Sequence, residues 1–281
     1  VIIQPDPIIS IQPIPSQSIC EGGTIGTPLF VNYSGGVGTA SYQWQNSGMN
    51  LAGANASSFT PSGITSPGTY SFSVVLSLSG SGCDSDTSQD AIITVVPDPI
   101  VILQPVSDTY CIGAVPVDTL VILANGGIGT YGYQWYSNTT NSNIGGILIG
   151  GATDSTFIPS VNSIGTIYYY CEIIQSGVNC NTVSSPASIV TTSAPTFTTQ
   201  PIDSQSVCLD GTLIALAVSY QNGVGIPFYQ WFVNTSNSYS AGVPINGATN
   251  SNYIPPSNIT GTFYYYCVVS LSKGGCSSIV S

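Results

Sequence analysis

The chain has 281 residues, of which 42% are hydrophobic and only 5% are charged, and its formal net charge is −11. Lys273 is the single basic residue, so binding to nucleic-acid phosphates or to an anionic membrane surface is disfavoured. No apolar run approaches the roughly 20 residues that a membrane-spanning helix needs. We expect neither nucleic-acid binding nor membrane insertion, and we read the start at Val1 as that of a processed, mature chain.

The first residues resemble the end of a domain. "VIIQPDPIISIQP" at 1–13 has the same layout as "ITVVPDPIVILQP" at 93–105, where an apolar run is followed by Pro-Asp-Pro. In the interior copy the apolar run is typical of a closing strand, and Pro-Asp-Pro is typical of a linker. We therefore expect a strand tail that consists of Val1, Ile2, Ile3 and Gln4.

Three copies of one pattern follow, with a period near 95 residues. Each has "YQW" (42–44, 133–135, 229–231), a Gly-Ala turn (53–59, 151–157, 247–253) and a Gly-Thr strand (68–74, 165–171, 261–267). Short segments rich in β-branched and aromatic residues, separated by turn residues, predict all-β sandwiches. The expected core residues are Trp44, Trp135 and Trp231.

These repeats set the predicted domains: a strand and linker at 1–6, then domains at 7–97, 98–193 and 194–281. The first two should close with "AIITVV" (91–96) and "ASIVTT" (187–192). In the third, "SSIVS" (277–281) lines up with "NTVSS" (181–185), which precedes the closing strand. The third domain is therefore expected to lack its final strand.

The pattern resembles the immunoglobulin-like (Ig-like) fold, and more closely the Ig-like repeats of Bacteroidetes cell-surface proteins, which include gliding-motility adhesins. The resemblance lies in the "YQW", the Gly-Ala turn, the "GT-YYYC" strand, a late cysteine, and a Cys-x-Gly turn at Cys20, Cys111 and, with one insertion, Cys208. It implies three tandem Ig-like sandwiches outside a bacterial cell. Such modules serve as spacers, binders and filament subunits.

Eight cysteines without any histidine or Cys-x-x-Cys pair favour disulfides in an oxidising, extracellular setting over a zinc site. The expected bonds join the two equivalent cysteines of each domain: Cys20 with Cys83, Cys111 with Cys180, and Cys208 with Cys276. Cys171 and Cys267 are left over. They are either buried thiols, or partners of Cys111 and Cys208 in place of Cys180 and Cys276, or links between subunits.

An incomplete third domain leaves three explanations open. In the first, Val1–Gln4 of a neighbouring copy completes it beside Ser277, Ser278, Ile279, Val280 and Ser281, which produces a head-to-tail filament. In the second, the sequence is a part of a longer array of domains in a surface adhesin that binds a glycan or another cell surface. In the third, a terminal strand is simply lost. Copies of the chain itself are the expected partner in the first case, which we prefer.

Enzymatic activity and a cofactor are not expected, because no histidine is available for a catalytic triad. Asp84, Asp86 and Asp90 are weak candidates for calcium ligands, and a solvated turn is the preferred interpretation. Possible glycosylation sites are Asn138 and Asn234, which begin Asn-x-Ser/Thr sequons, and Thr119 and Ser155, which follow aspartates as in Bacteroidetes O-glycosylation sites.

Overall fold

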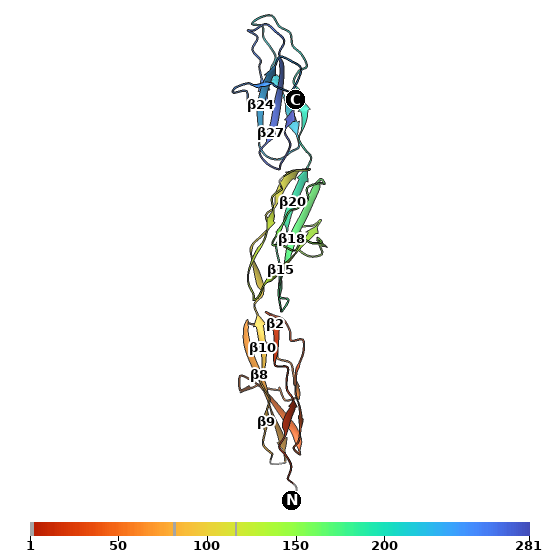
Figure 1. Ribbon diagram of the computed structural model, residues 1–281, viewed down its shortest axis with the longest axis vertical. Helices are drawn as coiled ribbons and strands as arrows, with labels where there is room; N and C mark the ends of the chain where they lie inside the picture. The colour runs from red at the N-terminus through yellow and green to blue at the C-terminus, as the bar shows by residue number, and fades with distance from the viewer. Residues whose placement is uncertain (1–2, 81–82, 116) are drawn as a thin grey trace. The chain divides into compact units, whose positions relative to one another are not determined.

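The computed structural model describes residues 3–80, 83–115 and 117–281. Over these residues the chain forms β-strands that recur in the same order in three repeats (Figure 1). No helix that could span a membrane occurs in this part of the chain. Two compact units are present: the first comprises Val1–Leu103, Leu123–Tyr133 and Glu172–Val183, and the second comprises Gln104–Ile122, Gln134–Cys171 and Ser184–Ser281.

The first repeat is built around one large sheet. Its strands are β1 Ile8–Ile11, β2 Ser16–Cys20, β3 Leu29–Phe30, β4 Asn32–Ser34, β5 Thr39–Asn46, β6 Met49–Asn50, β7 Ser58–Phe59, β8 Gly68–Ser79, β9 Asp86–Thr87 and β10 Ala91–Val96. The large sheet has the order β2-β10-β8-β5-β6, with β9 also paired to β8, and β1–β4 and β3–β7 form two short ladders. The closing strand β10 lies between β8, to which it is antiparallel, and β2, to which it is parallel (Figure 1).

The alternation of the strands explains the core of this repeat. Every second residue of a strand points to the same face, and Val74 of β8 and Ile93 of β10 are fully buried on the face that also receives Trp44. Leu29 of β3 packs into the same cluster from the short ladders. Burial of each such side chain contributes about 1.5–3 kcal/mol, so the apolar residues between the sheets hold the sandwich together.

The second repeat has the same organisation. Its strands are β11 Pro99–Leu103, β12 Asp108–Cys111, β13 Leu120–Val121, β14 Leu123–Gly126, β15 Tyr131–Asn138, β16 Ile147–Leu148, β17 Thr156–Phe157, β18 Gly165–Gln175, β19 Asn181–Val183 and β20 Ala187–Thr192. The large sheet has the order β12-β20-β18-β15-β16, with β19 on β18. β10 and β20 coincide with the closing strands that the sequence predicts, which confirms both.

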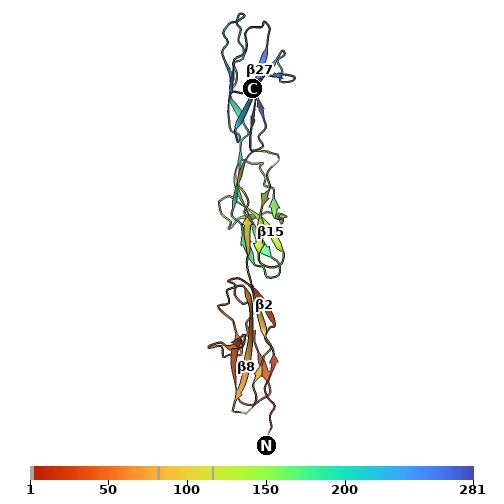
Figure 2. The ribbon, with the colours of Figure 1, turned by 90° about the vertical axis from the view of Figure 1, so that its left-hand side faces the viewer.

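The third repeat lacks a closing strand. Its strands are β21 Thr196–Thr199, β22 Leu216–Ala217, β23 Ser219–Gln221, β24 Pro227–Asn234, β25 Val243–Pro244, β26 Asn252–Tyr253, β27 Tyr264–Leu271 and β28 Ile279–Val280. The main sheet has only the order β25-β24-β27-β28, and within the described ranges no strand corresponds to β10 or β20. Figure 2 shows β27 and the chain end in this repeat. The prediction of an incomplete third sandwich is confirmed.

A hydrogen-bonded frame around each tryptophan explains the "YQW" and Gly-Ala motifs. The indole Nε1 of Trp44 donates to the carbonyl of Ala56 (2.9 Å), and the amide Nε2 of Gln43 donates to the carbonyl of Leu51 (2.8 Å). The indole bonds recur from Trp135 to Asp154 and from Trp231 to Asn250, each at 2.9 Å. All three tryptophans are fully buried, which confirms their predicted role in the core.

Replacement of Trp44 by Phe should weaken the first repeat locally, because the ring is retained while the carbonyl of Ala56 loses its buried donor. We expect a cost of about 1–3 kcal/mol in local stability. Hydrogen exchange should reveal it as faster exchange of the Leu51 amide, which donates to the Trp44 carbonyl. Met49→Ala, at an exposed position of β6, is the control and should change stability by less than about 0.5 kcal/mol. Equal exchange in the two variants would contradict this role of the indole.

Candidate functional site

Two disulfides join cysteines of consecutive repeats. Cys20 bonds to Cys180 with a Cα–Cα distance of 5.4 Å, and Cys111 bonds to Cys276 with a distance of 5.1 Å. Each pair lies inside one of the two compact units. The expected bonds Cys20–Cys83, Cys111–Cys180 and Cys208–Cys276, all within single domains, are therefore wrong.

The length of β8 explains the error. Val96 lies opposite Cys20, and its neighbour Val95 lies opposite Gly68, so Cys20 is near the start of β8. Cys83 follows the other end of β8, which has 12 residues and at about 3.3 Å per residue spans roughly 40 Å. A disulfide needs Cα atoms within about 7 Å. The two cysteines of one repeat are thus at opposite ends of it.

Other polar groups accompany the two bonds. In the second unit, the N–H of Cys111 donates to the carbonyl of Gly274 (2.8 Å). In the first unit, the carboxylate of Asp98 lies within 4.8 Å of the sulfurs of Cys20 and Cys180. These two sulfurs are bonded to each other, so the trio is not a set of metal ligands.

The remaining cysteines differ in exposure. Cys171 and Cys267 are fully buried, as one of the three alternatives had it, and belong to neither disulfide. Burial raises the pKa of the Cys267 thiol to about 11. The alternative in which Cys171 takes Cys111 is wrong, because Cys111 bonds to Cys276. Cys83 and Cys208 also take part in neither disulfide, and Cys208 is exposed.

The missing strand exposes an edge along the start of β27. Gly68–Phe72 of β8 pair with β10, and Gly165–Tyr169 of β18 pair with β20. The equivalent segment 261–265 has no such partner in the described part of the chain, and β27 begins only at Tyr264. Phe263 is 37% exposed, while its equivalents in the other repeats are half-buried. This edge presents unpaired backbone groups next to apolar side chains.

A second segment borders the same gap. Gln205–Cys208 corresponds to β2 and β12, which pair with the closing strands, but it forms no strand itself. Val207 is 45% exposed, whereas its equivalents Ile19 and Tyr110 are 8% and 4% exposed. The side chain of Gln205 nevertheless holds the segment in place, because it donates to the carbonyl of Ile214 (2.9 Å) and accepts from its N–H (2.7 Å). The gap therefore has two fixed sides.

The predicted strand-exchange residues are placed only in part. β28 pairs with β27 as β19 pairs with β18, and Ser281 exchanges hydrogen bonds with the backbone of Cys267 as Ser184 does with Cys171. Ser281 thus takes the place of Ser184, one residue earlier than the sequence alignment has it. Val1 and Ile2 lie outside the described residues, and Ile3 and Gln4 are exposed and outside any strand.

Asp84 and Asp86 form hydrogen bonds with residues near the start of the chain. Asp86 accepts a hydrogen bond from the N–H of Ile9 (2.7 Å), and the N–H of Asp84 donates to the carboxylate of Asp6 (3.1 Å). Asp90 is exposed. Among the described residues, the carboxylates of Asp84, Asp86 and Asp90 do not lie close enough together to form a cluster of three metal ligands.

The expected glycosylation sites stay predictions. The amide of Asn138 donates to the carbonyls of Ser142 (3.1 Å) and Ile144 (3.2 Å), and that of Asn234 makes the same pattern of bonds in the third repeat. These asparagines therefore stabilise their own loops. Thr119 is exposed and Ser155 is half-buried.

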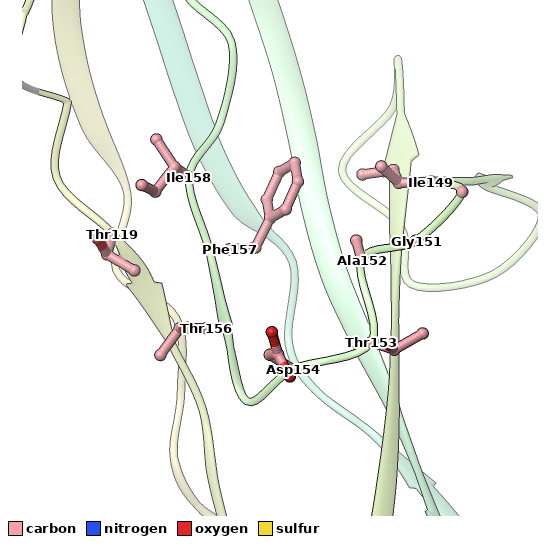
Figure 3. Close-up of a pocket in the computed structure, with 10 residues that line it drawn as sticks. Thr119, Ile149, Gly151, Ala152, Thr153, Asp154, Thr156, Phe157 and Ile158 are labelled. Carbon is pink, nitrogen blue, oxygen red and sulfur yellow. The ribbon is translucent and has the colours of Figure 1, made fainter.

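A pocket of about 470 Å³ lies beside the Gly-Ala turn of the second repeat. In Figure 3, Phe157 and Ile158 lie between Thr119 and the turn from Gly151 to Asp154. Asp154 is the one ionisable side chain in its lining, and the carbonyl of the same residue accepts the indole bond of Trp135. The same turn therefore lines the pocket and accepts the hydrogen bond of the buried indole.

Comparisons with known proteins agree with this architecture. The titin I-band fragment I67–I69 is 13% identical to this chain, and its TM-score is 0.50. The match covers 100% of this chain and 97% of the titin fragment. The chain is a tandem array of Ig-like β-sandwiches. Sidekick-1 immunoglobulin domains 1–5 (18% identical, 99% of this chain, TM-score 0.41) and Drosophila OTK extracellular domains 3–5 (18%, 99%, 0.39) are also similar. The chain spans 58% of the Sidekick-1 fragment and 98% of the OTK fragment.

At the level of sequence the comparisons are narrower. A family described as "Domain of unknown function (DUF8696)" matches residues 199–281, and no curated protein matches the chain. The resemblance to Bacteroidetes surface proteins stays a prediction, as does the absence of enzymatic activity. The two disulfides indicate a secreted or extracellular protein.

The exposure of Cys208 and the burial of Cys267 predict different reactivities. At pH 7.5 a maleimide should label Cys208 in the folded protein, because the thiol is accessible. Cys267 should react only in denaturant, since its raised pKa and its burial suppress the thiolate that is the nucleophile. Peptide mass spectrometry assigns the label to a residue, and Cys208→Ser is the control that should lose the label from the peptide that contains position 208. Native labelling of Cys267 would show that the third core is open.

Proposed function

We propose that the protein is a structural subunit of an extracellular filament or surface stalk, in which copies join head-to-tail by exchange of a β-strand. In this arrangement Val1–Gln4 of one copy completes the third repeat of the next. The observation that carries the proposal is the unpaired edge at 261–265, opposite a segment, Gln205–Cys208, that is already held in place. An exposed sheet edge invites pairing with another chain.

The register of the complete repeats predicts where the strand would lie. Val1 is equivalent to Ile93, which lies opposite Tyr70 of β8 and Gln17 of β2. In the third repeat these places are taken by Phe263 and Gln205. Val1 and Ile3 would then point to the same face of the strand, toward the core of the third repeat.

Apolar burial favours this occupant. The equivalents of Val1 and Ile3 in the first repeat, Ile93 and Val95, are fully buried, whereas Ile3 is 89% exposed in the isolated chain. Burying two such side chains contributes on the order of 3–6 kcal/mol. Backbone pairing on both sides of the strand would add to this.

The symmetry of the contact determines the product. The donor is at the start of the chain and the acceptor is in the third repeat, so the two surfaces of the contact are different. Such a heterologous contact forms an open chain of copies unless a rotation happens to close it. A filament or stalk is therefore the expected assembly.

Chains that carry their own closing strand test the proposal. After Ser281 we would append the residues that follow Ser184, namely "SPASIVTT" (185–192). The wild-type chain should form extended assemblies in electron micrographs and by light scattering. The self-complemented chain should remain a monomer, heavier than the 29.0 kDa wild-type chain only by the eight appended residues, because its own strand occupies the acceptor. Assembly of the self-complemented chain to the same extent would overturn the proposal.

Side chains on the donor strand point alternately toward and away from the core of the third repeat, which provides a matched pair of variants. Ile3→Asp should abolish assembly, because it places a charge in the third core. Ile2→Asp should assemble, since Ile2 is equivalent to Thr94, which is only half-buried. Equal effects of the two substitutions would contradict the register. A native chain whose reduced mass exceeds 29.0 kDa, with a further repeat that supplies the strand, would overturn exchange between copies.

A further inference from the structure

Cys20, Cys111 and Cys208 have the same local structure. The N–H of the residue three positions later donates to the cysteine carbonyl, at 2.9 Å for Cys20, 3.1 Å for Cys111 and 2.8 Å for Cys208. In the first two repeats this cysteine forms a disulfide with the repeat that follows. Cys208 keeps the same turn, is exposed and forms neither bond. The third repeat thus presents the first half of a link that the chain makes twice.

The second half of the link is Cys180 or Cys276. Each follows the buried cysteine of the long strand, Cys171 or Cys267, by nine residues. Cys83 follows Val74, which is equivalent to those buried cysteines, by the same nine residues. In the first repeat, therefore, Cys83 occupies the position that receives the disulfide from a preceding repeat.

The position of Cys83 relative to the donor strand supports this. The N–H of Asp84 donates to the carboxylate of Asp6 (3.1 Å), so the Cys83 turn lies beside the linker that follows Val1–Gln4. Asp98 is equivalent to Asp6, and its carboxylate lies within 4.8 Å of the bonded sulfurs of Cys20 and Cys180. At the complete joint Cys20 lies opposite Val96, which is the equivalent of Gln4. Strand exchange would therefore bring Cys208 of the acceptor copy to Cys83 of the donor copy.

We infer that each head-to-tail joint is closed by a disulfide between Cys208 of one copy and Cys83 of the next. This inference rests on the proposed function for the arrangement of the copies. The bond gives a covalent chain of subunits, in which the joint between copies has the same chemistry as the joints between repeats.

The reaction is a thiol–disulfide exchange that needs an oxidant. The Cys208 and Cys83 thiols together lose two protons and two electrons and form one S–S bond. An oxidant that is itself a disulfide, such as oxidised glutathione or an oxidoreductase, accepts both electrons and both protons and leaves as two thiols. The exposed thiol of Cys208 is the accessible nucleophile.

Two complementary variants test the bond. Cys208→Ser keeps Cys83, and Cys83→Ser keeps Cys208, so neither variant alone can make the link, whereas a mixture can. Each variant is purified, mixed with the other in oxidised glutathione, and run on a denaturing gel without reductant. We expect a species of twice the chain mass in the mixture alone, a ladder for the wild type, and collapse to 29.0 kDa on reduction. Mass spectrometry of peptic fragments should show Cys83 joined to Cys208.

The double variant Cys83→Ser/Cys208→Ser separates this inference from the proposed function. It should still form extended assemblies in electron micrographs, yet fall apart in denaturant without reductant. Assemblies of the wild type that also fall apart without reductant would overturn the disulfide and leave strand exchange standing. A Cys208–Cys208 bond in Cys83→Ser alone would overturn the disulfide as well. If no chain assembles and no link forms, both proposals fail.

Discussion

Each sandwich depends on a closing strand that is the last strand of its repeat and yet lies inside the sheet. β10 pairs with β8 on one side and with β2 on the other, and it buries Ile93 in the core. The third repeat shows what depends on this strand. Without it, β27 begins only at Tyr264 and Gln205–Cys208 forms no strand. A strand flanked on both sides stabilises two neighbours, so its absence leaves two edges open.

The disulfides also connect neighbouring parts of the array, because each joins two consecutive repeats. The cysteine at the end of β2 or β12 is near the closing strand of its own repeat, and it bonds to the late cysteine of the next repeat. Neither disulfide is contained in a single repeat. A chain with 5% charged residues and a single Lys can form few salt bridges. Strand pairing, apolar cores and these disulfides therefore stabilise the repeats.

Much of the fold could be predicted because its signals are local. The β-strand alternation, the buried Trp44, Trp135 and Trp231, and the closing strands 91–96 and 187–192 all follow from short-range patterns. The internal repeat also identified the incomplete third sandwich, because three copies of one pattern can be compared directly. For the candidate site, the sequence identified the missing strand but not Gln205–Cys208 or Phe263, whose exposure depends on what is absent beside them.

By itself, the sequence determined that the chain is three β-sandwiches in tandem, that each has a tryptophan core, and that the third ends before its closing strand. Only the tertiary structure decided which cysteines meet. Counting cysteines per repeat paired Cys20 with Cys83, but those residues flank opposite ends of the 12-residue β8. A disulfide forms only when the two Cα atoms lie within a few ångströms of the required distance. Strand length and register set that distance, and they can bring together residues far apart in the chain, such as Cys20 and Cys180.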